Sequence, residues 1–123
     1  MSKTLVFAVD FDGCLVEFDF PKIGKQTEKQ KELMKILKGL QKKGHKLILW
    51  TSRGEPALQE SIDWCNEQGL KFDSFQVNPF TEKLSGPSPK IVADYYIDDK
   101  ALEFGDNDSR DRTLLLLGRL LDE

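Results

Sequence analysis

Two apolar runs stand out in this chain because each ends abruptly in polar residues. The first covers Leu5 to Val9 and is followed by Asp10-Phe11-Asp12-Gly13. The second covers Leu47 to Trp50 and is followed by Thr51-Ser52. Short apolar runs with β-branched and aromatic residues are typical of strands that are buried on both faces. We therefore predict two buried strands, each with polar side chains at its end.

Helical periodicity follows the first run. Thr27 and Gln30 have the spacing of a capping box, and apolar residues recur from Leu33 to Leu40 on one helical face. Gly44 suits the left-handed residue that ends a helix. We predict a helix between Thr27 and Gly44. Further helices are predicted over residues 56–69 and 114–121, although Thr113 to Leu117 alone could also form a strand.

Two weaker strands complete the pattern. Phe72 to Val77 alternates apolar and polar residues, which fits an edge strand, and Ile91 to Ile97 is apolar apart from Asp94. Strands that alternate with helices indicate a parallel sheet with right-handed crossovers. We predict a three-layer α/β, Rossmann-like fold with helices on both faces of the sheet. The length of 123 residues favours a single domain over residues 1–123.

Composition excludes several classes of protein. The net charge of −3 argues against a general nucleic-acid binder, although not against a nucleic-acid end as substrate. The lysine-rich stretch from Lys22 to Lys46 is interpreted as a solvated helix face. No apolar run approaches the ~20 residues of a membrane span, and no signal peptide is evident. Cys14 and Cys65 lack CxxC spacing, so a reduced, cytoplasmic protein without membrane contact is expected.

The polar residues at the strand ends are expected to meet. In parallel α/β sheets, ligands bind beyond the carboxyl ends of the strands, where the strand order switches. Burial of several carboxylates there without a partner would be costly, and a cation would offset that cost. A carboxylate cluster without histidine or cysteine favours a hard cation, above all Mg²⁺. The residues expected at this edge are Asp10, Asp12, Thr51, Ser52, Asp98 and Asp99.

Such a site is suited to phosphoryl transfer. Thr51, Ser52 and neighbouring backbone N–H groups could hold a phosphate, and Lys90 or Lys83 could add positive charge. Phosphoryl transfer needs mainly positioning and charge neutralisation, and a carboxylate can serve as the nucleophile.

These residues resemble a known family, the haloacid dehalogenase-like (HAD) hydrolases. Val9 to Gly13 looks like the family's first motif, an apolar strand followed by DxDG, and Leu47 to Thr51 looks like the second. Lys90 can stand for the third motif, a lone lysine, and Tyr95 to Asp99 looks like the acidic fourth. The combination DFDG, W-T-x-R and YIDD is similar to small HAD-like hydrolases of bacteria and phages. The resemblance covers residues 5–99.

The resemblance implies a role for each matching residue. Asp10 would be the nucleophile, and Asp12 would protonate the leaving group and then activate water. Thr51 would hydrogen-bond the phosphoryl group, and Lys90 would offset negative charge, with Lys83 as the alternative lysine. The implied Mg²⁺ ligands are Asp10, the backbone carbonyl of Asp12, Asp98 and Asp99.

Other residues near the motifs have two interpretations. Gly13, Ser52 and Arg53 are expected to contact substrate, although Arg53 could instead cap its turn. Phe18 and Phe20 are expected to pack within a flap over residues 14–26, with stacking on a base as the alternative. The spacing of the motifs leaves no room for a cap domain. An open site would favour large substrates such as a protein or a nucleic-acid end.

The predicted function is therefore a Mg²⁺-dependent phosphatase that forms an aspartyl-phosphate on Asp10, with an unidentified substrate. One alternative is a phosphorylatable receiver domain of signalling proteins. That class carries its phosphorylated aspartate after the third strand, where this chain has Asn78. A second alternative is a non-catalytic binding protein on the same fold. The sequence does not indicate an oligomeric state.

Overall fold

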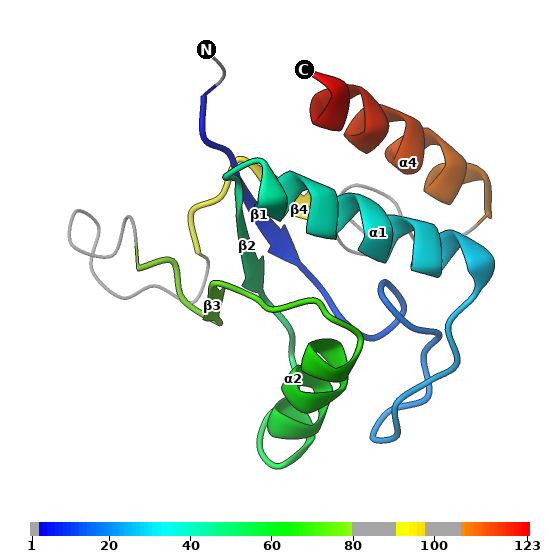
Figure 1. Cartoon of the computed structure of the whole chain (residues 1–123). Helices are drawn as coiled ribbons and strands as arrows, with labels where there is room; N and C mark the ends of the chain where they lie inside the picture. The colour runs from blue at the N-terminus through cyan, green and yellow to red at the C-terminus, as the bar shows by residue number, and fades with distance from the viewer. Residues whose placement is uncertain (1–2, 80–90, 98–106) are drawn as a thin grey trace.

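The computed structural model describes residues 3–79, 91–97 and 107–123. Strands and helices alternate along the chain, as the sequence predicts (Figure 1). The elements are β1 (Val6–Val9), α1 (Glu28–Lys42), β2 (Lys46–Leu49), α2 (Ala57–Glu67), β3 (Ser74–Phe75), β4 (Tyr95–Ile97) and α4 (Asn107–Asp122).

The four strands form one parallel sheet in the order β3-β2-β1-β4. The chain steps outward from β1 to β2 and β3, and then returns to the free side of β1 to form β4. The strand order therefore switches between β1 and β4. This order is that of a Rossmann-like sheet, which confirms the predicted α/β class.

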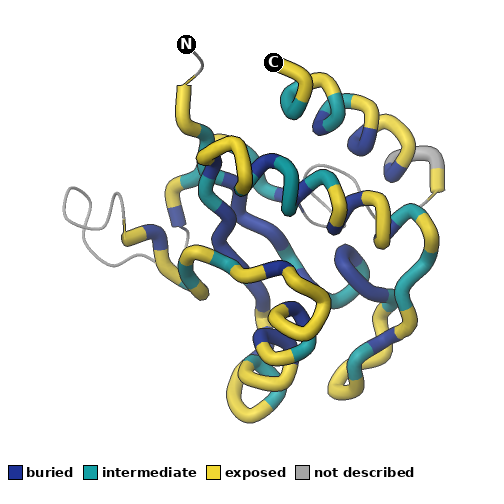
Figure 2. Tube along the Cα trace, viewed as in Figure 1, coloured by how far each residue is buried: buried dark blue, intermediate teal, exposed yellow. Residues whose placement is uncertain are grey.

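One face of the sheet carries the main core. Phe7 and Val9 of β1 pair in register with Leu47 and Leu49 of β2, and these four side chains are buried. Figure 2 shows the buried stretches of the helices turned toward the sheet. The residues that helices α1, α2 and α4 bury in this cluster are Leu33, Met34, Leu37, Leu40, Ile62, Cys65, Leu114 and Leu117.

The three helices of the described ranges lie on one face of the sheet, and the prediction of helices on the second face also concerns residues outside those ranges. Ala8 and Ile48, on the opposite face, pack against Ile91, so a segment before β4 covers them instead of a helix. The reason lies in the crossovers. The β1-α1-β2 and β2-α2-β3 units step in the same direction, so right-handed connections place both helices on the same face. Helix α4 joins them there because it packs against α1.

Local signals fix the ends of α1. The Thr27 side chain accepts a hydrogen bond from the Gln30 backbone, and the Gln30 side chain accepts one from the Thr27 backbone, which confirms the capping box. At the other end, Gly44 has φ 102°, a conformation that favours glycine. The N–H of His45 donates to the carbonyl of Leu40 at 3.1 Å and satisfies an end carbonyl of the helix.

Both outer strands are shorter than predicted. At the start of β4, the side chain of Asp94 accepts a hydrogen bond from the N–H of Val6 at 2.7 Å. The register of β4 with β1 therefore begins at Tyr95, which pairs with Phe7. β3 stops at Phe75 because Gln76 turns into the left-handed region at φ 62°.

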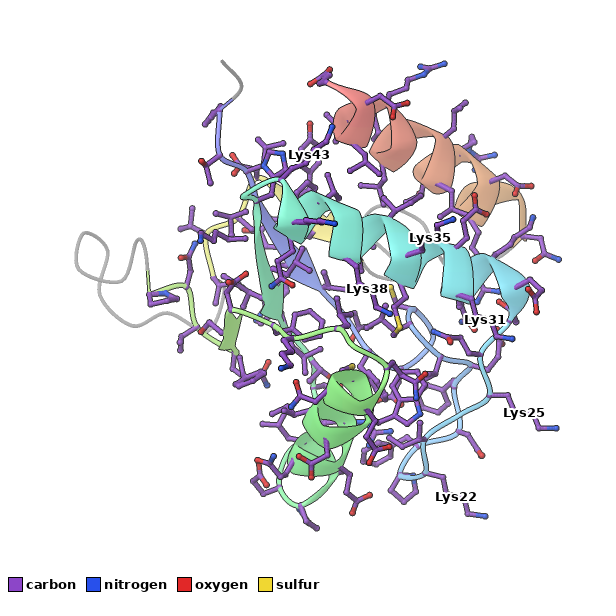
Figure 3. All side chains as sticks on the ribbon, in the orientation of Figure 1. Lys22, Lys25, Lys31, Lys35, Lys38 and Lys43 are labelled. Atoms are coloured by element: carbon purple, nitrogen blue, oxygen red, sulfur yellow. The ribbon has the colours of Figure 1, made fainter. Side chains whose placement is uncertain are left out.

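The lysine-rich stretch is a solvated surface, as predicted. Figure 3 shows Lys31, Lys35 and Lys38 spread along α1, with Lys22 and Lys25 on the loop that precedes it. Several lysines of this stretch have partners within the protein, such as Lys29, which pairs with Asp111 at 2.6 Å. Within the described ranges, no helix combines the length and the apolar character needed to cross a membrane.

The buried thiol of Cys65 predicts a pH dependence of stability. Burial raises its pKa from 9.0 to about 12. The unfolded chain therefore loses this proton at lower pH than the folded chain, and the stability present below pH 9 declines as the pH rises toward 12. Between pH 8 and pH 10, the free energy of unfolding should fall by about 1.4 kcal/mol more in the wild type than in Cys65→Ala. Urea denaturation measures the difference, and equal losses in the two proteins would contradict it.

Candidate functional site

Asp10 lies where β1 leaves the sheet, beside the switch in strand order. Its backbone N–H donates to the carbonyl of Ile97 in β4 at 2.9 Å. On the other side, the N–H of Trp50 donates to the carbonyl of Val9 at 2.9 Å. The backbone at Asp10 is therefore held between the ends of β2 and β4. This is the position at which parallel sheets bind ligands.

A tight turn follows Asp10 and places Asp12. The carbonyl of Phe11 accepts hydrogen bonds from the N–H groups of Cys14 at 3.1 Å and Leu15 at 3.0 Å. Gly13 has φ 79°, which few other residues adopt without strain. Cys14 is buried and its Sγ donates to the carbonyl of Ile97 at 3.6 Å, so it packs between the turn and β4.

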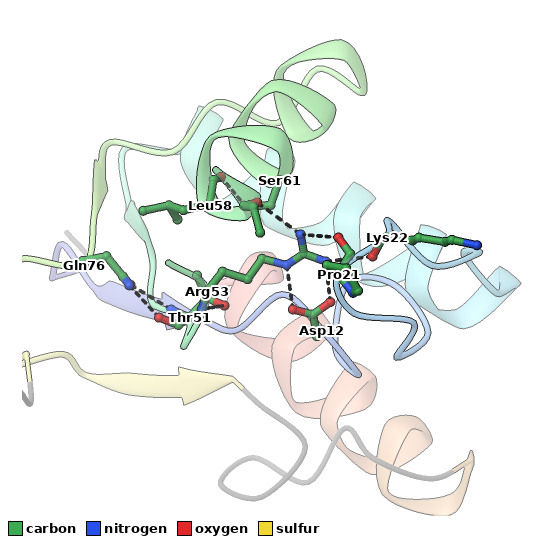
Figure 4. A network of polar contacts seen from close by, with 9 residues as sticks. Asp12, Pro21, Lys22, Thr51, Arg53, Leu58, Ser61 and Gln76 are labelled. Carbon is green, nitrogen blue, oxygen red and sulfur yellow. Dashed lines mark hydrogen bonds and ion pairs between the residues drawn. The ribbon is translucent and has the colours of Figure 1, made fainter. Parts of the chain in front are cut away.

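The Asp12 carboxylate is clamped by Arg53 (Figure 4). Nε of Arg53 donates to Oδ2 at 2.7 Å, and Nη2 donates to Oδ1 at 2.8 Å. The side chain of Arg53 is fully buried and that of Asp12 is 10% exposed. A bidentate pair in this setting is strong and fixes the plane of the carboxylate.

The remaining N–H groups of Arg53 hold the backbone around it. Nη1 donates to the carbonyls of Pro21 at 3.2 Å and Ala57 at 3.1 Å, and Nη2 donates to the carbonyl of Lys22 at 2.8 Å. All five donors of the guanidinium are thereby used within the protein. Arg53 therefore holds the turn and the flap in this structure, and its predicted contact with substrate stays a prediction. Its donors are committed to Asp12 and to three carbonyls.

Thr51 is fixed by a residue that the sequence did not reveal. The side-chain amide of Gln76 accepts a hydrogen bond from the N–H of Thr51 at 2.8 Å and donates to its carbonyl at 2.5 Å. These two hydrogen bonds continue the pairing at the edge of the sheet to Thr51, beyond the end of β2. The Thr51 hydroxyl oxygen accepts a hydrogen bond from the N–H of Arg53 at 3.2 Å. Gln76 lies within the predicted edge strand from Phe72 to Val77, so the sequence pattern gave no sign that its side chain would pair with Thr51.

A pocket of about 370 Å³ brings several predicted site residues together. Its lining includes both carboxylate residues, the exposed Ser52 and two phenylalanines that the flap supplies. The flap does not bury these rings as expected, since Phe18 is 73% and Phe20 is 49% exposed. The lining residues are Asp10, Asp12, Phe18, Phe20 and Ser52.

The other half of the predicted site lies outside the described residues. This applies to Lys83, Lys90, Asp98 and Asp99. Among the residues that the structure does describe, no group of three or more His, Cys, Asp or Glu side chains is placed to hold a metal ion. The donor chemistry at Asp10 nevertheless fits Mg²⁺, which prefers carboxylate and carbonyl oxygens. Asp12 has its carboxylate engaged by Arg53, so it would offer a metal its backbone carbonyl.

The parallel sheet and the pocket at its carboxyl edge define an α/β protein with a Rossmann-like arrangement of strands. A solved structure of a conserved protein from Bacteroides thetaiotaomicron is similar, with a TM-score of 0.76. The two sequences are 34% identical, and the match covers 95% of this chain and 93% of that protein. The chain belongs to the same family as that Bacteroides protein. No protein-family model matches the chain, and neither does any curated protein.

The ion pair predicts a large loss of stability when Arg53 is removed. Arg53→Met should lower the free energy of unfolding by about 3–5 kcal/mol, because it leaves the Asp12 carboxylate buried without a partner. The exposed Arg119 of α4 supplies the control, and Arg119→Met should change stability by less than about 0.5 kcal/mol. Urea denaturation measures both. Similar small losses in the two variants would mean that the clamp is not needed for folding.

The hydrogen bonds between the Gln76 side chain and the Thr51 backbone predict a second effect on stability. Gln76→Glu keeps the shape of the side chain but replaces the NH₂ donor with an oxygen that faces the carbonyl of Thr51. The variant should lose about 1–3 kcal/mol of unfolding free energy, because the Thr51 carbonyl then lacks its partner. Gln59→Glu, in α2, is the matched control, because it also loses an amide donor, to the Asp63 carboxylate at 2.9 Å, but at an exposed position. Its loss should be about 0.2–0.5 kcal/mol, the order of magnitude of an exposed i,i+4 pair. Equal stability of both variants would show that the Gln76 amide does not hold Thr51.

Proposed function

We propose that this protein is a Mg²⁺-dependent phosphatase of the HAD type that forms an aspartyl-phosphate on Asp10. One observation supports the proposal most directly. Asp10, Asp12 and Ser52 line the same pocket at the carboxyl edge of the sheet, beside the switch in strand order. The nucleophile, the proton shuttle and a polar phosphate contact proposed from the motifs therefore share one space.

The proposed reaction has two steps. In the first, a carboxylate oxygen of Asp10 attacks phosphorus, the bond to the leaving oxygen breaks, and Asp12 gives that oxygen its proton. In the second, Asp12 takes a proton from water as the water oxygen attacks the phosphorus of the aspartyl-phosphate. Inorganic phosphate leaves and the Asp10 carboxylate is restored.

Arg53 is proposed as a positioning residue for Asp12. It contacts both carboxylate oxygens, and each oxygen has a second lone pair that can carry a proton. The clamp fixes the plane of the carboxylate relative to the pocket. A held carboxylate loses little freedom when the reaction begins, and this preorganisation favours proton transfer.

The proposed metal would be held by Asp10, the backbone carbonyl of Asp12, Asp98 and Asp99. When bound, Mg²⁺ neutralises charge on the phosphoryl group as it transfers. Thr51 is proposed to hydrogen-bond that group, with Ser52 and the backbone near Gly13 as further contacts. Lys90, or Lys83 in its place, would add positive charge.

The proposed substrate is a phosphate ester that reaches an open site. In the described residues, the segment between β1 and α1 is a short flap, and only α2 separates β2 from β3. Neither segment forms a cap domain over the pocket. Large phosphorylated substrates, including a nucleic-acid end, would therefore have access.

The strand order argues against the alternative of a receiver domain. Receiver-type sheets have the order 2-1-3-4-5, in which the third strand lies beside the first. Here β3 lies beside β2, at the edge of the sheet. A binding protein without catalysis on this fold remains the second alternative, and an activity assay separates it from the phosphatase.

The phosphatase proposal predicts a metal-dependent activity that requires both aspartates. The protein should hydrolyse p-nitrophenyl phosphate with Mg²⁺ and lose this activity in EDTA. Asp10→Asn should reduce hydrolysis to background because an amide is a poor nucleophile, and Asp12→Asn should reduce kcat by about 10²–10⁴-fold. Release of p-nitrophenol measures all of these rates.

Asp122→Asn, at an exposed site near the end of α4, is the matched control and should retain full activity. Full activity of Asp10→Asn would remove the nucleophile assignment. No Mg²⁺-dependent turnover of this ester or of a broad panel of phosphate esters would favour the non-catalytic alternative.

A further inference from the structure

The flap, residues 14–26, is held by hydrogen bonds within the segment from Glu17 to Lys25. Its two ends are joined by a hydrogen bond from the N–H of Glu17 to the carbonyl of Lys25 at 2.8 Å. Gly24 packs so closely there that a Cβ would lie 1.8 Å from the carbonyl oxygen of Glu17. At the tip, the N–H of Lys22 donates to the carbonyl of Asp19 at 2.9 Å. The flap is therefore closed at its base and turned at its tip.

The flap is also tied to the site itself. Arg53, which clamps Asp12, donates to the carbonyls of Pro21 and Lys22 in the flap (Figure 4). The guanidinium carbon of Arg53 lies 5.2 Å from the centre of the Phe20 ring. The position of the flap relative to Asp12 is thus set by several contacts from one buried side chain.

This fixed flap presents two aromatic rings to solvent instead of burying them. Phe18 is 73% exposed and Phe20 is 49% exposed. Both line the same pocket as Asp10 and Asp12. A single exposed phenylalanine needs no explanation, but two on a rigid support at the rim of one polar pocket form a preorganised apolar surface. Arg53 covers one face of Phe20, so Phe18 is the ring with more free area.

We propose that Phe18 and Phe20 bind a planar aromatic ring on the leaving group of the phosphate ester. This inference rests on the proposed function, since it places the phosphoryl group at Asp10 in the same pocket. Aromatic side chains at the rim stack on any planar ring, including every nucleobase. The ring could belong to a nucleotide or to an aryl phosphate, which share this chemistry.

Space for the rest of the leaving group lies on the far side of Phe20. Phe20 also lines a second pocket of about 520 Å³, which Pro21, Pro56 and Ala57 help to form. The two pockets share the Phe20 ring, so the second pocket lies next to the proposed stacking surface. A substrate longer than a simple sugar phosphate fits this arrangement.

Binding of phosphate esters tests the proposal independently of turnover. Calorimetry in Mg²⁺, with every protein carrying Asp10→Asn so that no ester is consumed, would compare adenosine monophosphate, phenyl phosphate and glycerol phosphate, and hydrolysis would be measured separately with Asp10 in place. The first two should bind more tightly than glycerol phosphate. Phe18→Ala should weaken binding of the aromatic esters by about 5- to 100-fold, the usual range for loss of one stacking partner, and leave glycerol phosphate unchanged. Phe18→Leu should not restore the loss, because leucine is apolar but not planar.

Leu115→Ala is the matched control, because Leu115 is an exposed apolar residue of α4 at 58% exposure and should leave all affinities unchanged. A preference for the nucleotide over phenyl phosphate that Phe18→Ala removes would identify the nucleobase as the source of the ring. Equal affinities for all three esters that do not change in Phe18→Ala would overturn the proposal, even if every ester is hydrolysed.

The failure of the aromatic surface can be told apart from the failure of the phosphatase. Ring-dependent binding without hydrolysis would support the aromatic surface and refute the phosphatase. A change in oligomeric state in Phe18→Ala with unchanged affinities would also overturn the proposal, because it would make the rings a contact between copies.

Discussion

The buried ion pair between Arg53 and Asp12 organises the carboxyl edge of this protein. A guanidinium with no exposed area would be costly unless every donor had a partner. Asp12, Pro21, Lys22 and Ala57 supply those partners. The turn after β1, the flap and the start of α2 are therefore held by one side chain. Removal of Arg53 would disturb three segments that do not otherwise belong to the sheet.

The sequence predicted those parts of the fold that depend on local signals. The cap at Thr27 and the glycine at Gly44 act within a few residues, so the bounds of α1 could be predicted closely. β1 and β2 could be predicted because a central strand of a parallel sheet must be apolar on both faces. The outer strands could not be delimited in this way. Their lengths depend on Asp94 and Gln76. The side chains of these residues, and not backbone groups, accept hydrogen bonds from the N–H groups of Val6 and Thr51, which are far away in the sequence.

In the candidate site, too, local signals could be predicted, whereas contacts between residues far apart in the sequence could not. Adjacent motifs placed Asp10, Asp12 and Ser52 at one edge, and the pocket brings these three together. The partner of Asp12 was beyond prediction, because Arg53 is 41 residues away and the sequence gives no sign of which carboxylate it meets. A solvent-facing arginine and a buried one have the same local pattern. The exposure of Phe18 was missed for the same reason, since it depends on how tightly the flap is held.

The edge of the sheet and the rim of the pocket are fixed by different means. Asp10 is held by backbone hydrogen bonds to β4, which continue the ladder. Asp12 and the flap are both hydrogen-bonded to Arg53, which links their positions. Opening of the flap must either break the hydrogen bonds from Arg53 to the carbonyls of Pro21 and Lys22, or move Arg53 and with it the Asp12 carboxylate. Because the first course leaves donors of a buried guanidinium without partners, Asp12 and the aromatic rim are expected to keep their relative positions.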